Sequence, residues 1–377
     1  MRVFKFGGAS VKSADAVKNV SKVLNDQGDG PLVVVVSAMG KITNKMEQLV
    51  DAYYHNTDSK KTQLAEVKSF HQTIIKDLRI SENDYYEVEN LLIELECIIE
   101  KKRDESSSYD TEYDRIVPFG ELLSTKIVST YLNRQGYNNR WIDARNFIIT
   151  TNKNRSANVL WEESVSLING SLKPLIEKQT VITQGFIGRG LNHKNTTLGR
   201  EGSDYSAAIF AFALDAKSVT IWKDVDGVMN ADPRRFDEAE LIPKLSYNEA
   251  IELAYYGASV IHPKTIQPLK SKDIPLYVKS FLDPSKAGTV VLENESRTLN
   301  ETQCYIVKDQ QSLIKIASKD FSFIVEENIS EIFQVLHENK MKVDLIQNSA
   351  ISFSVCVYDK FNRLKELLSI LKATFKV

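Results

Sequence analysis

The sequence has few cysteines and no histidine pattern of the kind that binds metal. Its three cysteines, Cys97, Cys304 and Cys356, are scattered. Such an odd, sparse set argues against a disulfide framework and fits a reducing compartment. No HExxH motif and no Cys/His cluster occur around the five histidines, which stand at positions 55, 71, 193, 262 and 337. We therefore expect no zinc site.

A surplus of charge and a membrane segment are also missing. The chain has 48 Lys and Arg against 50 Asp and Glu, a formal net charge of −2, so nothing indicates a nucleic-acid or acidic-membrane partner. No apolar run approaches the roughly 20 residues that cross a bilayer. The first residues do not have the pattern of a signal peptide. We expect a cytoplasmic protein.

What the chain does have is enough apolar sequence for two or three domains, with 377 residues of which 42% are hydrophobic. Its first ten residues, MRVFKFGGAS, predict a short strand that breaks at Gly7 and Gly8 before a helix. Backbone N–H groups at such a turn favour an anion, which the ammonium of Lys5 could also reach. Neither GxGxxG nor GxxxxGK[ST] spacing is present, so a purely structural turn remains an alternative.

The periodicity of the rest of this part is typical of an α/β domain with a mainly parallel sheet. Residues 32–36 (LVVVV) predict a strand buried on both faces. Residues 44–103 are expected to be mostly helical, whereas 104–114 and 185–202 are expected to be loops. Further strands are expected at 140–142, 180–186, 218–222, 277–280 and 289–292, and helices at 13–24, 122–132, 204–214 and 246–256. Ser246 and Glu249 fit the Ser-x-x-Glu capping box at the start of the last of these helices.

A domain boundary is predicted at Glu293–Gln303, which is polar and without periodicity. We expect one domain over 1–293 and a second over 304–377. The second shows the order strand, helix, strand, strand, helix, strand of small ferredoxin-like domains. Its strands are expected at 313–316, 343–346, 351–357 and 374–377, and its helices at 329–338 and 361–371.

Polar and glycine-bearing patches follow several predicted strands, where ligands of open α/β sheets bind. They are the Lys5–Gly8 turn, Ser37 with Thr43, Gly120–Glu121, Thr197–Asp204, Lys223–Arg234 and Tyr255–Lys264. Ser203 or Asp204 could simply cap a helix, while Arg200 suits a carboxylate or phosphate clamp. The 223–234 patch could be turn chemistry alone, and His262 before a proline is more typical of a structural residue.

Six of these segments, in this order, resemble aspartate kinases of the amino-acid kinase superfamily: KFGGAS, SAMGKITN, FGELLS, TLGREGSD, DVDGVMNADPR and ELAYYGASVIHPKT. The resemblance covers residues 1 to 293, and the C-terminal unit is similar to the ACT regulatory domain of these enzymes. It implies a three-layer α/β kinase domain followed by an ACT domain. It also implies transfer of the ATP γ-phosphoryl group to the β-carboxylate of L-aspartate, with Mg²⁺ carried on the nucleotide.

The same resemblance assigns roles by motif. Lys5 would neutralise the transferred phosphoryl group, with Gly7 and Gly8 offering N–H groups and Asp204 holding the catalytic lysines in place. Ser37, Thr43 and Ser203 would bind aspartate. Glu121 would bind the α-ammonium group of the aspartate, and Arg200 would bind the α-carboxylate of the aspartate. The nucleotide would contact Lys223, Asp224, Met229 and Arg234.

The sequence departs from the family at several of these places. Glu201 stands where the family has a glycine, and Met229 where it has an aromatic or polar residue. Ser259 stands where the family has a second phosphate-contacting lysine, so Lys264 or Lys223 would have to supply that charge. These two residues and Ser259 are included among the expected ATP contacts.

The regulatory part departs as well. The residues after Gln303 suffice for one ACT module where the family has two, as in a truncated chain or a short form. Asp344, Asn348 and Ser349 are weak candidates for effector contacts, against an ordinary strand corner. Ala350 replaces an acidic residue of lysine-inhibited members, which argues against strong lysine inhibition. We expect a homodimer formed through ACT domains, because such domains expose sheet edges.

Two alternatives to an active aspartate kinase remain. Another member of the superfamily would act on glutamate, carbamate or a nucleotide, but Arg200 and Glu121 argue for a free amino acid. A catalytically impaired amino-acid sensor would keep the fold, and Ser259 and the short tail are its support. The sequence does not decide the feedback effector.

Overall fold

The computed structural model describes residues 1–257, 261–293, 303–320 and 322–377, and it leaves the side chains of residues 82 and 83 undescribed. The described residues form two compact units. Unit 1 holds those between Met1 and Tyr255 and those from 261 to Cys304, and unit 2 holds Tyr256, Gly257 and those from Tyr305 to Val377. The predicted boundary at Glu293–Gln303 falls mainly on residues 294–302, which lie outside the described residues.

Unit 1 is built on an eight-stranded sheet with the order β3-β5-β2-β1-β8-β10-β11-β9. Every neighbouring pair is parallel except β10 and β11. The predicted α/β class with a mainly parallel sheet is therefore confirmed. The strands are β1 (Arg2–Phe6), β2 (Leu32–Val36), β3 (Asn139–Trp141), β5 (Thr180–Gln184), β8 (Val219–Lys223), β9 (Lys244–Ser246), β10 (Leu276–Ser280) and β11 (Thr289–Leu292).

Side chains alternate between the two faces of this sheet, and helices cover both. Val34 and Val36 join one apolar core with α1 (Ala14–Gln27) and α6 (Phe119–Arg134). Val33 and Val35 join the other core, with α9 (Gly202–Ala213) and α11 (Pro263–Lys270). All five residues of β2 are buried, as expected for a central parallel strand. The result is the predicted three-layer arrangement.

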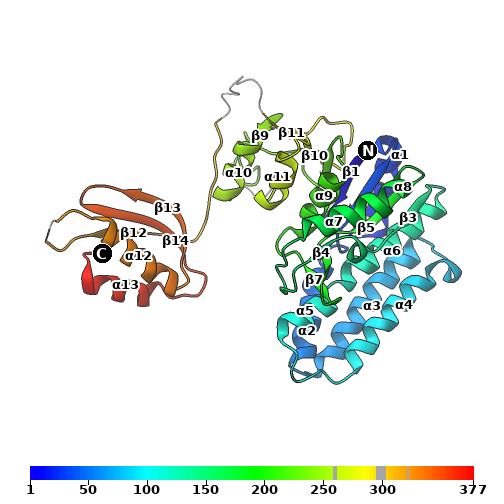
Figure 1. Ribbon diagram of the computed structural model, residues 1–377, viewed down its shortest axis with the longest axis horizontal. Coiled ribbons are helices and arrows are strands. Elements are labelled where there is room, and N and C mark those ends of the chain that lie inside the picture. The colour runs from blue at the N-terminus through cyan, green and yellow to red at the C-terminus, as the bar shows by residue number, and fades with distance from the viewer. Residues whose placement is uncertain (258–260, 294–302, 321) are drawn as a thin grey trace. The chain divides into compact units, whose positions relative to one another are not determined.

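Helices α2 to α5 gather beside the sheet, coloured blue to cyan in Figure 1. They are α2 (Ile42–Tyr54), α3 (Ser59–Asp77), α4 (Glu82–Glu100) and α5 (Tyr109–Ile116). The predicted loop at 104–114 was wrong from Tyr109 onward, because Ser108 caps α5 by accepting a hydrogen bond from the Thr111 backbone N–H at 3.2 Å. No helix in the described ranges is long and apolar enough to cross a membrane.

A second, small sheet takes two of its three strands from the segment that was predicted to be a loop at 185–202. Its order is β4-β6-β7, and its strands are β4 (Ile149–Thr150), β6 (Ile187–Gly190) and β7 (Asn195–Thr197). The loop prediction was wrong here because β6 and β7 pair antiparallel around a tight turn at His193, whose φ is +61°. The glycines at positions 188 and 190 lie inside the short strand β6, and glycine is uncommon in strands, so the sequence pattern did not predict a strand there.

The remaining elements of unit 1 complete its helical layers. They are η1 (Gly8–Val11), η2 (Ala144–Asn146), η3 (Ile168–Leu172), α7 (Trp161–Leu167), α8 (Lys173–Ile176) and α10 (Tyr247–Tyr256). The predicted capping box at the start of α10 is confirmed. Ser246 Oγ accepts from the Glu249 N–H at 3.1 Å, and the Glu249 carboxylate accepts from the Ser246 N–H at 2.7 Å.

Unit 2 follows the predicted order of a ferredoxin-like domain. Its elements are β12 (Gln311–Ala317), α12 (Glu326–Glu338), β13 (Lys342–Asn348), β14 (Ser352–Tyr358) and α13 (Leu364–Thr374). The strands form an antiparallel sheet in the order β12-β14-β13, and the predicted last strand is a single bridge between Ala317 and Lys376. Both helices pack on one face of the sheet (Figure 1), against Ile314, Ile316 and Val355.

Candidate active site

A cavity of about 540 Å³ lies where β1, β2, β5 and β8 end. Parallel strands bring their carboxyl ends to one edge of the sheet, so residues far apart in the sequence meet there. Eight of the predicted site residues line it: Lys5, Ser37, Thr43, Glu121, Arg200, Ser203, Asp204 and Lys223. The other lining residues are Glu47, Tyr113, Arg155, Phe186, Gly199, Glu201 and Gly202.

A buried ion pair forms the floor of this cavity. Lys5 shares the face of β1 that α9 covers, and its Nζ lies 2.6 Å from Oδ1 of Asp204 in the first turn of α9. The two side chains are only 10% and 4% exposed. A buried charge is costly without a partner, so each residue fixes the position of the other.

Lys223, the last residue of β8, adds a second ammonium to this floor. Burial lowers its pKa, while the negative charge of Asp204 acts in the opposite direction and the ammonium of Lys5 adds to the lowering. The two ammonium groups lie at the same end of the cavity as Asp204 and Glu201, and both can donate to a bound anion. Such a site suits a phosphate.

Close packing accounts for the second of the two N-terminal glycines. A side chain at Gly8 would place its Cβ 2.6 Å from the carbonyl oxygen of Gly40, so glycine is required by the close approach of the loop after β2. Gly7 is extended, with φ −77°, and its Cβ would lie 3.3 Å from Lys5 Nζ. Neither is among the residues that line the cavity, and the turn that follows is the short 3-10 helix η1.

Glu121 is a buried carboxylate without a cation. It lies in the first turn of α6 and is 3% exposed, and its Oε2 has no hydrogen-bond partner in the described structure. Burial raises its pKa to about 8, although backbone N–H groups of its own residue and of Ala38 act against this. A buried oxygen of this kind is complementary to a bound ammonium group.

The remaining predicted substrate contacts line the same cavity as this carboxylate. Ser37 directly follows β2, and its carbonyl accepts from the Ser124 hydroxyl at 2.7 Å. Ser203 is packed against Gly185, where a Cβ would come within 2.5 Å of it. Arg200 is exposed at the rim, after Gly199 with φ +80°. The cavity thus holds a carboxylate, hydroxyl groups and a guanidinium, as an amino acid requires.

Three side chains that the sequence analysis missed form another wall. The Tyr113 hydroxyl donates to Glu47 Oε1 at 2.8 Å, and the Arg155 guanidinium lies 4.2 Å from the centre of the Tyr113 ring. Asp114 fixes this wall because it accepts from the Arg155 N–H at 3.0 Å and from the Thr197 hydroxyl at 2.7 Å. Burial raises the pKa of Asp114, against these hydrogen bonds.

Replacement of Arg155 with alanine is expected to weaken the binding of a carboxylate ligand in this cavity by about 10-fold, because Arg155 lines it. A charge-assisted hydrogen bond to a carboxylate stabilises it by roughly 1.5–3 kcal/mol, and about 1.4 kcal/mol corresponds to 10-fold. Arg103→Ala is the matched control, because Arg103 stacks on Tyr54 at 4.3 Å without lining the cavity. Calorimetric titration giving both variants the same affinity for a carboxylate ligand would contradict this role.

The start of α9 differs from the prediction. Capping by Ser203 or Asp204 was one alternative, but the helix begins at Gly202 and the N-cap is Glu201. Glu201 has the left-handed conformation with φ +52°, and its side chain makes no capping hydrogen bond. The capping alternative was wrong because Asp204 is drawn into the helix by its ion pair with Lys5.

Besides Gly7 and Gly8, four further predicted nucleotide contacts do not line the cavity: Asp224, Met229, Arg234 and Lys264. Arg234 pairs with Asp232 on an exposed turn at 2.9 Å. Lys264 Nζ donates to the Leu198 carbonyl at 3.2 Å, and burial lowers the pKa of Lys264. Ser259 lies outside the described residues.

The three candidate effector residues are in unit 2. Asp344 interrupts the register of β13 and is 10% exposed, and Lys308 Nζ lies 2.6 Å from its Oδ1. Ser349 Oγ accepts from, or donates to, Ser352 Oγ at 2.8 Å. Asn348 ends β13. The segment is therefore a strand and its corner, with one carboxylate held by a lysine.

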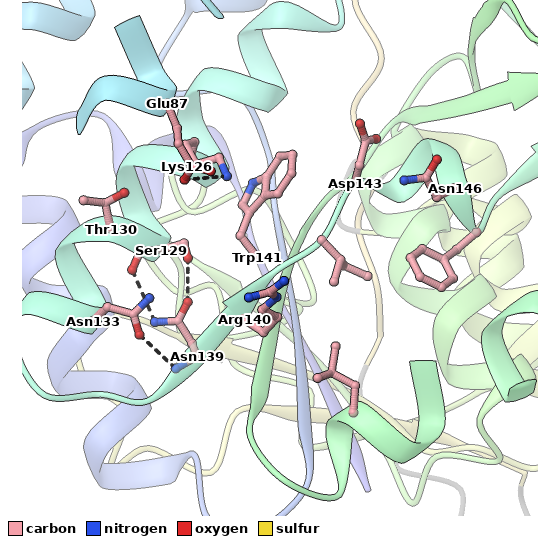
Figure 2. Close-up of a pocket in the computed structure, with 13 residues that line it drawn as sticks. Glu87, Lys126, Ser129, Thr130, Asn133, Asn139, Arg140, Trp141, Asp143 and Asn146 are labelled. Carbon is pink, nitrogen blue, oxygen red and sulfur yellow. Dashed lines mark hydrogen bonds and ion pairs between the residues drawn. The ribbon is translucent and has the colours of Figure 1, made fainter. Parts of the chain in front are cut away.

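A second cavity, of about 610 Å³, borders the edge strand β3 (Figure 2). Lys126 lies there between two partners, with Nζ 2.9 Å from Glu87 Oε2 and 3.7 Å from the centre of the Trp141 ring. The Ser129 hydroxyl donates to Asn139 at 2.6 Å. Because these groups satisfy one another, this cavity is less suited to the predicted chemistry than the first.

Within the described ranges, no group of three or more His, Cys, Asp or Glu side chains could hold a metal ion. A metal in the first cavity would therefore need oxygen ligands from a bound molecule. The orphaned Oε2 of Glu201 is a protein oxygen that fits such a partly external site.

Comparison with known proteins agrees with this geometry. The model of the amino acid kinase family matches residues 1–280. The chain is 32% identical to chloroplastic aspartokinase 2 of Arabidopsis thaliana, over 94% of the chain and 65% of the relative. It is also 32% identical to lysine-sensitive aspartokinase 3 of Escherichia coli, over 94% of the chain and 77% of the relative. The chain thus spans less than two thirds of the plant protein's length.

Solved structures are similar over the whole chain. The crystal structure of E. coli aspartokinase III with lysine and aspartate has a TM-score of 0.86 at 30% identity, and 84% of it is covered. The structure of the same enzyme with aspartate and ADP has a TM-score of 0.80, also at 30% identity and 84% coverage. By its sequence and its fold, the chain belongs to the amino acid kinase family and, within it, to the aspartokinases.

Proposed function

We propose that the protein is an ATP-dependent aspartate kinase that forms 4-phospho-L-aspartate, the first step toward lysine, threonine and methionine. One observation carries this proposal: a single cavity holds both the buried Glu121, with an orphaned oxygen, and the buried ion pair of Lys5 and Asp204, with Lys223 also in its lining. The carboxylate suits the substrate ammonium and the lysines suit the phosphates. The aspartokinase relatives support it, and aspartate and ADP are bound in one of them.

In the proposed reaction, an oxygen of the aspartate β-carboxylate attacks the γ-phosphorus while the bond to the β-phosphate oxygen breaks and ADP leaves. No general base is needed because this carboxylate is ionised at neutral pH. Catalysis then consists of positioning and charge stabilisation. Glu121 binds the ammonium, Arg200 the α-carboxylate, and Ser37, Thr43 and Ser203 orient the substrate. Lys5 neutralises the transferred group, and Asp204 holds Lys5.

The nucleotide contacts are proposed from the motifs. Gly7, Gly8 and Lys223 would face the phosphates, and Asp224, Met229 and Arg234 the rest of the nucleotide. Phosphoryl transfer from ATP uses a divalent metal, which we propose is Mg²⁺. When bound, it supplies positive charge to the phosphate oxygens.

The family has a second phosphate-contacting lysine at the position of Ser259. We expect Lys223, rather than Lys264, to supply the positive charge that this lysine would provide. Lys223 lines the cavity, whereas Lys264 is bound to the Leu198 carbonyl. We expect Lys223→Met to lower kcat by about 10²-fold, as for removal of one electrostatic donor. Lys264→Met should change kcat less than about threefold on the same grounds. A loss confined to Lys264→Met would reverse the assignment, and unchanged kcat in both would remove it.

We propose that residues 1–293 are the catalytic domain and 304–377 an ACT regulatory domain. Asp344, Asn348 and Ser349 are the proposed effector contacts, and the Lys308–Asp344 pair would compete with a cationic effector. We also propose a homodimer formed through the exposed edges of the ACT sheet, and a cytoplasmic location on the grounds of the sparse cysteines.

An assay with ATP, Mg²⁺, aspartate and hydroxylamine tests the activity. The acyl phosphate reacts with hydroxylamine, so aspartyl hydroxamate and ADP should form in equal amounts. Binding of aspartate without ADP formation would instead support the amino-acid sensor. Turnover with glutamate or carbamate but not aspartate would support another member of the family.

A further inference from the structure

Glu201 combines two unfavourable features in one residue. Its backbone is left-handed, with φ +52°, a conformation in which glycine is favoured over residues that have a Cβ. Its Oε2 is buried without a hydrogen-bond partner in the described structure. The side chain of this N-cap residue does not cap its helix, so local structure does not account for the carboxylate. Such outliers concentrate at functional sites.

Three lining carboxylates have a buried oxygen without a hydrogen-bond partner in the described structure, and one of these, Asp204 Oδ1, lies 2.6 Å from Lys5 Nζ in an ion pair. The other two, from Glu121 and Glu201, are orphaned. A buried carboxylate oxygen without a donor is stabilised by a cation. The proposed reaction brings two cations into this cavity, the substrate ammonium and the divalent metal that accompanies ATP. The two orphaned oxygens therefore match two incoming charges.

The neighbours of each carboxylate decide which cation it receives. Glu121 accepts from the backbone of Ala38, close to Ser37 on the substrate side. Glu201 is near Lys223 on the phosphate side, where its charge raises the pKa of that lysine against the larger effect of burial. Asp204 is already paired with Lys5. Asp224 also acts on Lys223 but does not line the cavity, so Glu201 is the lining carboxylate on this side that is left for a metal.

We propose that Glu201 is a direct ligand of the divalent cation that binds with the nucleotide. This inference rests on the proposed kinase function. Mg²⁺ in nucleotide sites is typically held by one or two carboxylates together with phosphate oxygens and water. One glutamate therefore suffices when the nucleotide is present, which agrees with the absence of a three-residue metal group in the described ranges.

The test is binding of Mn²⁺ in the presence of ADP, measured by the loss of the free Mn²⁺ signal in electron paramagnetic resonance. Glu201→Gln keeps the size of the side chain and removes its charge, and it should weaken Mn²⁺ binding at least about 10-fold. Glu201→Gly should weaken it equally while raising the melting temperature, because glycine tolerates the positive φ.

Asp215→Gly is the matched control. Asp215 follows the other end of α9 with φ +48°, pairs with Lys272 and does not line the cavity. Asp215→Gly should leave Mn²⁺ binding unchanged. Both variants remove a carboxylate from a left-handed residue, so weaker Mn²⁺ binding in Glu201→Gly alone would be due to the loss of a metal ligand.

The inference would be overturned if Glu201→Gln bound Mn²⁺ in the presence of ADP as tightly as the wild type does, even if the variant were more stable. If this occurred in a protein that makes aspartyl hydroxamate, the proposed function would stand and the ligand assignment alone would fail. If the wild-type protein bound no Mn²⁺ with ADP and formed no hydroxamate, both would fail.

Discussion

Replacement of Lys5 with methionine is expected to lower kcat by about 10³-fold, which corresponds to roughly 4 kcal/mol of transition-state stabilisation. The reason is positional, because Lys5 lies on the buried floor of the cavity and its ammonium is held at 2.6 Å by Asp204. An ammonium fixed in a dry site stabilises developing charge far more than a mobile surface lysine does. Hydroxamate formation under saturating substrates measures the effect.

The Lys5 variant has a second expected defect, which must be separated from the first. Loss of one partner leaves Asp204 as an uncompensated buried charge, which costs about 3–5 kcal/mol of folding free energy. The double variant Lys5→Met with Asp204→Asn removes both charges and should recover most of that stability while staying inactive. Recovery of activity in the double variant, or normal kcat in the single one, would contradict the role of Lys5.

Replacement of Glu121 with glutamine is expected to raise the KM for aspartate at least about 100-fold, because a neutral amide cannot compensate the buried ammonium. The same change should stabilise the ligand-free protein at alkaline pH. Burial raises the pKa of Glu121 to about 8 from an ordinary value of 4.5, so the folded state favours the protonated form.

The sign of the pH dependence follows from this raised pKa. The contribution of Glu121 to stability is fully present below pH 4.5 and is lost as the pH rises toward 8. The loss is at most about 5 kcal/mol, taking 1.36 kcal/mol per unit. Thermal melting should therefore show that Glu121→Gln gains more over the wild type at pH 9 than at pH 6. An equal gain at both would contradict the raised pKa.

Aspartate binding should show the opposite dependence. The carboxylate must lose its proton to bind an ammonium, so affinity should rise with pH up to about 8 and then level off. Calorimetric titration in two buffers of different ionisation enthalpy should detect a proton released on binding at pH 7. No proton release, or an affinity that falls between pH 6 and 8, would argue against Glu121 as the ammonium site.

The sequence was most informative where one local pattern determined the structure. Five consecutive apolar residues, Leu32–Val36, predicted a central parallel strand, and Ser246 with Glu249 predicted the start of α10. The substrate side of the cavity followed from polar residues directly after strands, such as Ser37, since parallel strands end at one edge. These features depend on neighbours in the sequence rather than on distant contacts.

Other features depend on contacts that a local pattern does not contain. Asp204 has the character of a helix cap, yet its ion pair with Lys5, from a distant strand, places it inside α9. Arg155 reaches the cavity because Asp114, far away in sequence, holds its backbone at φ +60°. The one local signal for this wall was Ser108, a residue type that favours the start of a helix, within a polar segment. Recognised as a cap, it would have predicted α5, the helix that holds Tyr113 and Asp114.

The most direct test of the central claim follows an oxygen atom. With aspartate labelled by ¹⁸O in its β-carboxylate, attack of that carboxylate on the γ-phosphorus places a labelled oxygen between carbon and phosphorus. Hydroxylamine then attacks the carbon and releases phosphate that retains this oxygen. The account predicts one ¹⁸O in each phosphate, visible as an isotope shift in ³¹P NMR. Unlabelled phosphate, from attack of water on ATP, would contradict it.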